Sequence, residues 1–181
     1  MVRRHQSAVW GTVYRTLGHS PESEDIVQEV FLRALAALPW FNRRYPFGPW
    51  IIRITANCCI DQLRRRKTRR TKLFSDLTEE EEGRVLNTLA AAPEVVLLED
   101  DDKARYLPMA WSLLERLKPR LRMVFVLREI EERSYKEVAE ILGIPEVTAR
   151  GRVLRARAHL HKAFRRRLTA LKRGIKNEKT L

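Results

Sequence analysis

Hydrophobic residues recur every three or four positions along most of the chain, a period typical of amphipathic helices. A first helix is expected over residues 2–17, ending at Gly18. A second helix is expected to open at Ser20, with serine as the N-cap, Pro21 in the first turn, and acidic residues at the positive end of the helix dipole. This pattern predicts an all-α fold.

Three prolines and a glycine interrupt the pattern between residues 39 and 49, so this segment is expected to be a loop. A long helix is then predicted from Trp50 to about Arg70, strongly basic at its C-terminal end. Cys58 and Cys59 are neighbours in this helix and point about 100° apart. For such a pair, packing in the core is favoured over a disulfide or a metal site.

The middle of the chain is acidic. Residues 73–105 contain the clusters Glu79–Glu82 and Glu99–Asp102, which indicate a solvated linker rather than a metal site. Two further helices are expected after it, over Leu107–Leu117 and Pro119–Ile130. The linker would therefore separate two small helical domains.

The second half of the C-terminal domain has the plan of a helix-turn-helix. Ser134 and Glu137 form a capping box that opens a helix over Tyr135–Leu142. Gly143 ends that helix, and Pro145 starts the next one after a tight turn. In this motif the second helix enters the major groove of DNA.

The last helix has an apolar stripe and a basic face. Such a helix could lie on an anionic membrane, but the stripe is narrow, rich in alanine and without tryptophan, which favours DNA. The stripe comprises Ala149, Val153, Ala156, Leu160 and Ala163. The opposite face comprises Thr148, Arg152, Arg155, His159 and Lys162, flanked by Arg150, Arg157 and Arg165.

Charge is distributed unevenly along the 181 residues, whose net charge is +13 and whose pI is about 10.4. The net charge is +9 for residues 1–75, −7 for residues 76–105 and +11 for residues 106–181. Two basic blocks around an acidic segment suggest two modules that face nucleic acid and a linker that does not.

The sequence offers no sign of a membrane or metal protein. It has no run of 18 apolar residues and no secretory signal, so a cytoplasmic location without membrane insertion is expected. The four histidines lack Cys or His partners at zinc-ligand spacing, so neither a metal nor another cofactor is expected.

Two motifs resemble those of extracytoplasmic-function (ECF) sigma factors of bacterial RNA polymerase. Residues 22–35 and 47–67 resemble the second conserved region of that family, and residues 113–164 resemble the fourth. The resemblance implies a subunit that is not an enzyme, binds core RNA polymerase and recognises two elements of promoter DNA. Its parts would be region 2 (1–72), the acidic linker (73–105), region 4 (106–170) and a basic tail (171–181).

The resemblance also assigns site residues. The core polymerase-binding residues are Asp25, Gln28, Glu29 and Phe31. The minus-ten DNA-binding residues are Trp50, Arg53, Asn57, Arg64 and Arg65, with Arg66 and Lys67 as further phosphate contacts. The minus-thirty-five DNA-binding residues are Pro145, Thr148, Arg150, Gly151, Arg152 and Arg155. For Trp50 a core position fits the pattern equally well, and Arg152 is expected to read a base.

Two other classes of protein compete with this interpretation. A stand-alone helix-turn-helix regulator would use its N-terminal half as a sensor, for which an apolar pocket with few charges is expected, whereas this half is basic and ends in RRRKTRR. A nucleic-acid enzyme needs converging carboxylates or a placed nucleophile, but the acids outside the linker are scattered along helix faces. The family resemblance further implies an anti-sigma factor as a partner.

Overall fold

The computed structural model describes residues 2–75 and 101–178, and every regular element in these residues is helical. The all-α prediction is therefore confirmed. The elements in order are α1 (Val2–Leu17), α2 (Pro21–Ala37), the 3₁₀ turn η1 (Leu38–Trp40), α3 (Phe47–Ser75), α5 (Asp101–Leu114), α6 (Pro119–Phe125), the π-helical turn η2 (Val126–Ile130), α7 (Tyr135–Leu142) and α8 (Glu146–Glu178). The predicted linker lies mainly outside the described residues.

The turn between α1 and α2 is built from short-range hydrogen bonds. Gly18 has a φ of 85°, a left-handed conformation that favours glycine, and its N–H donates to the carbonyl of Tyr14 at 2.9 Å. The hydroxyl of Ser23 donates to the Gly18 carbonyl at 2.6 Å. Ser20 occupies the N-cap position as expected, but its side chain makes no capping bond to the backbone.

The long basic helix begins earlier than its pattern predicts. α3 starts at Phe47, so Pro49 lies inside its first turn, where a missing N–H removes no helical hydrogen bond. The residues before it remain irregular apart from η1. Leu38 continues the apolar spacing of the second helix in the sequence, but it lies in η1 and is exposed.

Two C-terminal helices also end at other residues than the sequence pattern predicts. The helix predicted over 107–117 is α5, which contains Pro108 and ends at Leu114. The helix predicted over 119–130 is α-helical only to Phe125 and then widens into η2.

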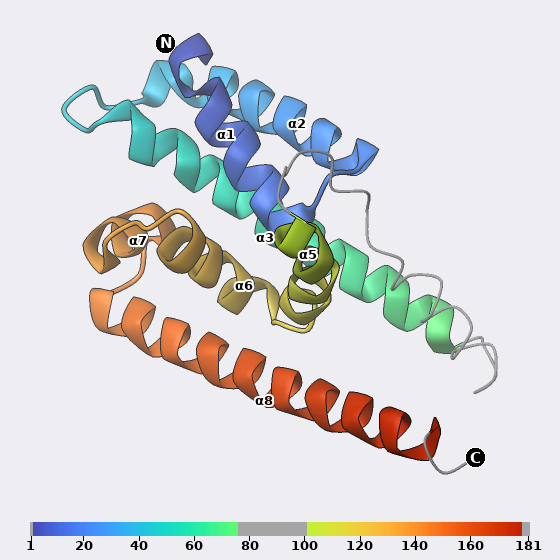
Figure 1. The fold of residues 1–181 in the computed structure, drawn as a ribbon. Helices are drawn as coiled ribbons and strands as arrows, with labels where there is room; N and C mark the ends of the chain where they lie inside the picture. The colour runs from blue at the N-terminus through green and yellow to red at the C-terminus, as the bar shows by residue number, and fades with distance from the viewer. Residues whose placement is uncertain (1, 76–100, 179–181) are drawn as a thin grey trace.

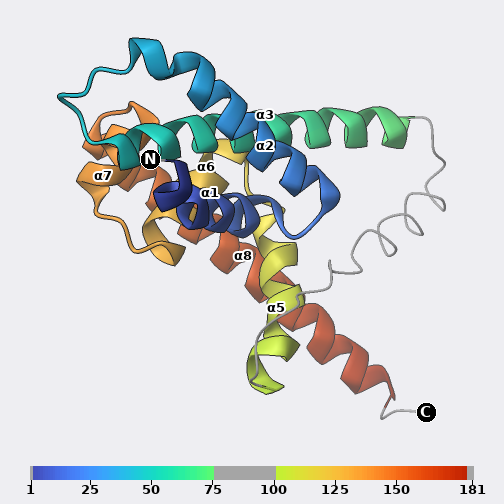
Figure 2. The ribbon, with the colours of Figure 1, turned by 90° about the horizontal axis from the view of Figure 1, so that it is seen from above.

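The N-terminal and C-terminal helices pack against each other. In Figure 1, α1 and α2 lie on one side of α3 while α6 and α7 lie on the other, and α8 runs along the outer side of α6 and α7. Seen from above in Figure 2, α8 passes beneath α1 and runs obliquely to α3, and α5 lies across it. The sequence predicts two modules but gives no indication of this packing.

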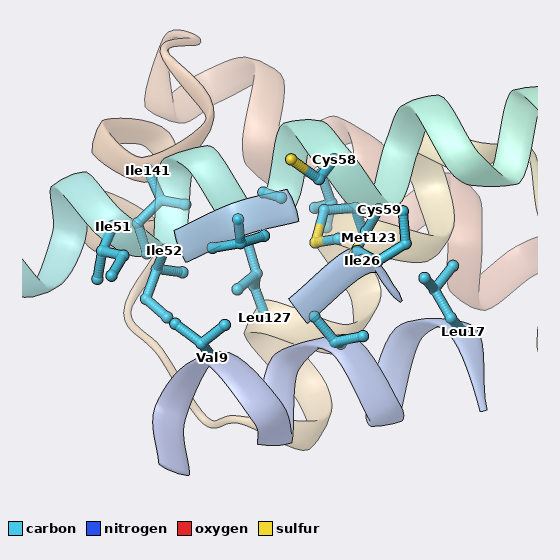
Figure 3. Packing of buried hydrophobic residues seen from close by; sticks show 14 of the residues in the cluster. Val9, Leu17, Ile26, Ile51, Ile52, Cys58, Cys59, Met123, Leu127 and Ile141 are labelled. Carbon is cyan, nitrogen blue, oxygen red and sulfur yellow. The ribbon is translucent and has the colours of Figure 1, made fainter. Parts of the chain in front are cut away.

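One hydrophobic cluster spans both modules. Figure 3 shows Val9 and Ile52 from the first module in the same cluster as Leu127 and Ile141 from the second. All four are at most 2% exposed. Cys58 and Cys59 are free, buried members of this cluster, which confirms their predicted packing role.

A second, smaller cluster belongs to the C-terminal helices alone. It joins α5, α6 and α8 through Leu114, Leu121 and Ala156, with Trp111 and Phe125 at its margin. Within residues 2–75 and 101–178, no helix has the length and apolar character needed to cross a membrane.

Candidate nucleic-acid interface

The helix-turn-helix has the geometry that its sequence predicts. The N–H of Glu137 donates to Ser134 Oγ at 3.2 Å, and the Ser134 N–H donates to Glu137 Oε2 at 2.8 Å, which completes the capping box. Gly143 ends α7 in the left-handed region, with φ 61° and ψ 42°. The carbonyl of Pro145 then accepts the first hydrogen bonds of α8, from the N–H groups of Thr148 and Ala149.

The faces of α8 separate as predicted. Ala149, Val153 and Ala156 are buried, and Leu160 and Ala163 are half-buried. Among the residues assigned to the minus-thirty-five element, those exposed to solvent are Pro145, Arg150 and Arg155. Those half-buried are Thr148, Gly151 and Arg152.

Neighbouring groups fix the positions of two arginines on α8. Arg150 donates to Glu146 Oε1 from Nε at 3.1 Å and from Nη2 at 2.6 Å, and its guanidinium lies 4.6 Å from the ring centre of Tyr135. Arg155 Nε donates to the Gly151 carbonyl at 3.1 Å. Both side chains thus lie along the helix surface rather than extending freely from it.

Arg152 lies in a positively charged environment. Partial burial, together with the charges of Arg120 and Arg155, lowers the pKa of Arg152. Three guanidinium groups that repel one another would gain from a shared anion, because the anion relieves the repulsion. A DNA phosphate is an anion of this kind.

Arg157, which flanks the basic face, is already paired. Its Nη2 donates to both carboxylate oxygens of Glu129, at 2.9 and 2.8 Å. This hydrogen bond raises the pKa of Arg157. The pair fastens α8 to η2.

On α3, the residues assigned to the minus-ten element form two groups. Trp50 is half-buried, and its ring centre lies 4.7 Å from that of Phe41 and 5.1 Å from that of Phe47. It is therefore part of an aromatic cluster. Arg53 and Asn57 lie one turn apart and are exposed.

The basic end of α3 contains both exposed and structural arginines. Arg64 and Arg65 are exposed, as a phosphate contact requires. Arg66 instead donates to Glu22 Oε2 at 2.8 Å and to the Leu17 carbonyl at 2.9 Å. Its side chain therefore ties α3 to the start of α2 and the end of α1, a distinction that the run of basic residues does not reveal.

The residues assigned to polymerase binding occupy α2. Asp25 and Gln28 are exposed, Glu29 is half-buried and pairs with Arg33, and Phe31 packs against the core. The structure adds two leucines on the exposed side of the same helix, Leu32 at 67% and Leu35 at 55% exposure. Helical spacing from Gln28 to these leucines is the sequence signal that could have found them.

Two large aromatic residues before α3 also face solvent. Trp40 is 87% exposed and Tyr45 is 68% exposed. Exposed aromatic rings can stack on unpaired bases. The family resemblance assigns the loop 39–49 to the pocket for a flipped base, but the list of site residues names neither of these two.

Comparisons with known proteins cover both modules. Residues 1–69 match the family described as Sigma-70 region 2, and residues 109–160 match Sigma-70, region 4. The chain is 31% identical over 165 residues to the ECF RNA polymerase sigma factor SigW of Bacillus subtilis, covering 89% of this chain and 85% of SigW. It is 32% identical over 160 residues to the ECF RNA polymerase sigma-E factor of Escherichia coli K12, covering 87% and 81% of the two chains.

Two solved structures have a similar fold. One is CnrH in complex with the cytosolic domain of CnrY, with 26% identity, a TM-score of 0.56, and coverage of 90% of this chain and 84% of the other. The other is the sigma factor RpoE in complex with the anti-sigma factor NepR from Bartonella quintana. Its TM-score is 0.64 at 20% identity, with 91% and 94% of the two chains covered.

Proposed function

The chain belongs to the ECF family of RNA polymerase sigma factors, which direct promoter recognition, and we propose a separate binding function for each of its segments. Residues 1–72 would act as region 2, binding core polymerase and the minus-ten element. Residues 106–170 would act as region 4, binding the minus-thirty-five element, with 73–105 as linker and 171–181 as tail. The observation that carries this division is the order of the two family matches, the second of which contains a capped helix-turn-helix.

We infer that α2 docks on core polymerase. Exposed Asp25 and Gln28 provide polar contacts, while Leu32 and Leu35 provide apolar area that is already accessible. Interfaces of this kind obtain most of their affinity from a few apolar or aromatic anchors surrounded by polar groups.

The start of α3 would hold the melted minus-ten strand. Asn57 offers both a donor and an acceptor to a base edge, and Arg53 is one turn away. Trp50 is half-buried among aromatic rings, so it would shape the pocket from behind. Arg64 and Arg65 would contact backbone phosphates.

The N-terminal half of α8 would enter the major groove at the minus-thirty-five element, as the second helix of this motif does. Pro145 and Thr148 lie at its first turn, and Arg150, Gly151, Arg152 and Arg155 follow along one side. Arginine is the residue best suited to grip guanine or phosphate with two hydrogen bonds.

We further infer that the chain is not an enzyme, acts where core polymerase is found, in the cytoplasm, and is controlled by an anti-sigma factor. The family members it matches are sigma factors, and one structural neighbour is a complex with an anti-sigma factor. Among the residues that the structure describes, no group of three His, Cys, Asp or Glu residues is placed to hold a metal ion.

Reconstitution with core polymerase tests the function. Core polymerase alone and core with the chain are incubated with sheared genomic DNA, and the retained fragments and their transcripts are sequenced. We expect start sites that share two upstream elements and appear only when the chain is present. A stand-alone regulator would instead retain specific DNA without core, and that result would reject the proposal.

A further inference from the structure

The side of α8 that points away from the protein carries an apolar strip. Its members are Val147, Gly151, Leu154 and Ala158. They follow one another at steps of four, three and four residues, so they share one face of the helix. At about 100° per residue, this face lies opposite the buried stripe of the same helix. None of the arginines between residues 150 and 157 lies on the strip.

Both large side chains of the strip are accessible. Val147 is 78% exposed and Leu154 is 69% exposed. The helix that carries them forms the outer edge of the C-terminal module in Figure 1. Arg150 and Arg157, on one flank of the strip, hydrogen-bond to glutamates of the protein itself and leave the strip uncovered. A single exposed aliphatic residue is ordinary, but two on one face of a helix that ends a helix-turn-helix indicate a contact surface.

The packing of the protein does not require the glycine in the strip. A Cβ atom added to Gly151 would lie 3.7 Å from Arg155 Nη2, which is an ordinary contact distance. Gly151 lies inside α8, where glycine is less stable than alanine. Its missing side chain leaves room between Val147 and Leu154 for a group from outside the protein.

The dimensions of the major groove determine what the strip would meet. An α-helix with its side chains is about 10–12 Å across, and the major groove of B-DNA is about 12 Å wide. A helix that fills the groove presents its outermost face to the base edges and its flanks to the two phosphate strands. On α8 the flanks carry Arg150 on one side and Arg152 on the other, with Arg155 between Arg152 and the strip. The charges therefore suit phosphates, and the strip suits bases.

An aliphatic surface can recognise only one group in the major groove. The side chain of Val147 has no hydrogen-bond donor or acceptor, and thymine is the base whose major-groove edge carries a methyl group. Contact between the two removes apolar surface of both from water. The amino group of cytosine or adenine, placed against valine instead, would lose its hydrogen bonds to water without replacement. Val147 would thus favour thymine and disfavour these bases.

We propose that Val147 is a specificity-determining residue, which selects thymine in the minus-thirty-five element by contact with the C5 methyl group, and that Gly151 and Leu154 complete the surface for that methyl group. This inference rests on the proposed function, because it concerns how α8 reads the promoter element assigned to it. Val147 is not among the residues that the sequence assigns to this element, since that assignment favours side chains that form hydrogen bonds.

Replacing thymine by uracil tests the proposal, because uracil lacks the methyl group and keeps every hydrogen-bonding atom. Holoenzyme affinity is measured on the preferred promoter, with uracil placed at each thymine of the minus-thirty-five element in turn, on both strands. We expect one of these substitutions to weaken binding by the parent about fourfold, the effect of one buried methyl group. With Val147→Ala, the same substitution should change the affinity by less than about twofold.

The variant and its control are both expected to fold. Val147 is exposed and alanine is the stronger helix former, so Val147→Ala should not lower the free energy of unfolding, which denaturant unfolding checks. The matched control is Ile130→Ala, at a 40% exposed aliphatic residue outside α8, which should keep the parent's response to uracil. Uracil at thymines between the two promoter elements is the control on the DNA and should leave the affinity of every chain unchanged.

The possible results separate this inference from the proposed function. A parent holoenzyme that binds all promoter variants equally would reject the proposed function, and this inference with it. A parent that prefers one promoter, but whose minus-thirty-five element contains no A·T pair or whose response to uracil is the same with Val147→Ala, rejects the inference alone. If Val147→Ala weakens binding of core polymerase without DNA and leaves the response to uracil unchanged, the strip binds protein and the inference is wrong.

Discussion

The guanidinium of Arg53 covers Gly143 so closely that a Cβ atom built on this glycine would clash with Arg53 Nη2. Gly143 serves two purposes at once. Its positive φ of 61° ends α7, and its lack of a side chain allows α3 to approach the turn of the helix-turn-helix. A backbone requirement inside one module therefore coincides with the contact between modules.

Gly143→Ala is expected to destabilise the chain for both reasons, and a double-mutant cycle separates them. The left-handed backbone costs about 1–2 kcal/mol for alanine in any background. The clash with Arg53 lowers the free energy of unfolding further, but only while Arg53 is present. Gly143→Ala should therefore destabilise an Arg53→Ala chain less than it destabilises the parent chain. Urea unfolding of the four chains measures the difference. Equal losses in both backgrounds would show that the contact with Arg53 contributes nothing.

The capping box of α7 should make stability depend on pH. Hydrogen bonds from the Ser134 side chain and backbone lower the pKa of Glu137 below its usual 4.5. Because the folded pKa is the lower one, the stabilisation is complete above pH 4.5 and is lost as the pH falls through the folded value. Ser134→Ala should therefore cost about 1 kcal/mol at pH 7 and less below pH 4.5.

Denaturant unfolding from pH 7 to pH 3 measures this change, with Ser7→Ala as the control, since Ser7 is exposed and lies inside α1 rather than at a cap. The control should shift stability by less than about 0.5 kcal/mol at every pH. A Ser134→Ala loss that stays constant across this range would contradict the role of the Glu137 carboxylate.

The exposed face of α2 gives a test of polymerase docking. Gln28→Ala combined with Leu32→Ala should weaken core binding tenfold or more, which corresponds to about 1.4 kcal/mol, because both side chains are accessible and lie on one face. Unfolding stability should change little, since neither residue belongs to the buried core. Leu154→Ala, at an equally exposed leucine on α8, is the matched control. Unchanged affinity in a core polymerase pull-down would remove α2 from the docking surface.

What the sequence predicts well is local. The capping box at Ser134, the helix end at Gly143 and the apolar stripe of α8 all depend on residues within a few positions of one another, and all three are present in the structure. Leu38 shows the limit of periodicity, because the pattern continues through it although the helix has already tightened into η1.

What the sequence does not reveal depends on long-range packing. A run of arginines does not show that Arg66 bonds to Glu22, because the two are 44 positions apart. The contact of Thr12 with Glu131 spans 119 positions and has no local signature. The packing of the two modules against each other has no local signature in the sequence for the same reason.

The arginines of α8 offer a final test, in which the structure changes an expectation. The sequence favours a base contact for Arg152, but partial burial beside Arg120 and Arg155 places it where a phosphate would relieve repulsion between like charges. Arg155 is more exposed and is the better candidate for a base edge. Arg152→Ala should therefore weaken holoenzyme binding about equally on all promoter variants and reduce the salt slope by about one.

Arg155→Ala should instead cost about 1–3 kcal/mol on the preferred promoter and relax preference at one base position. The measurement is holoenzyme affinity on a set of single-base variants of the upstream element at two salt concentrations. Lys162→Ala, exposed two turns further along α8, serves as the control for general loss of charge. If Arg152→Ala relaxed the preference at a single base, its assignment to phosphate would be wrong and the base contact favoured by the sequence would stand.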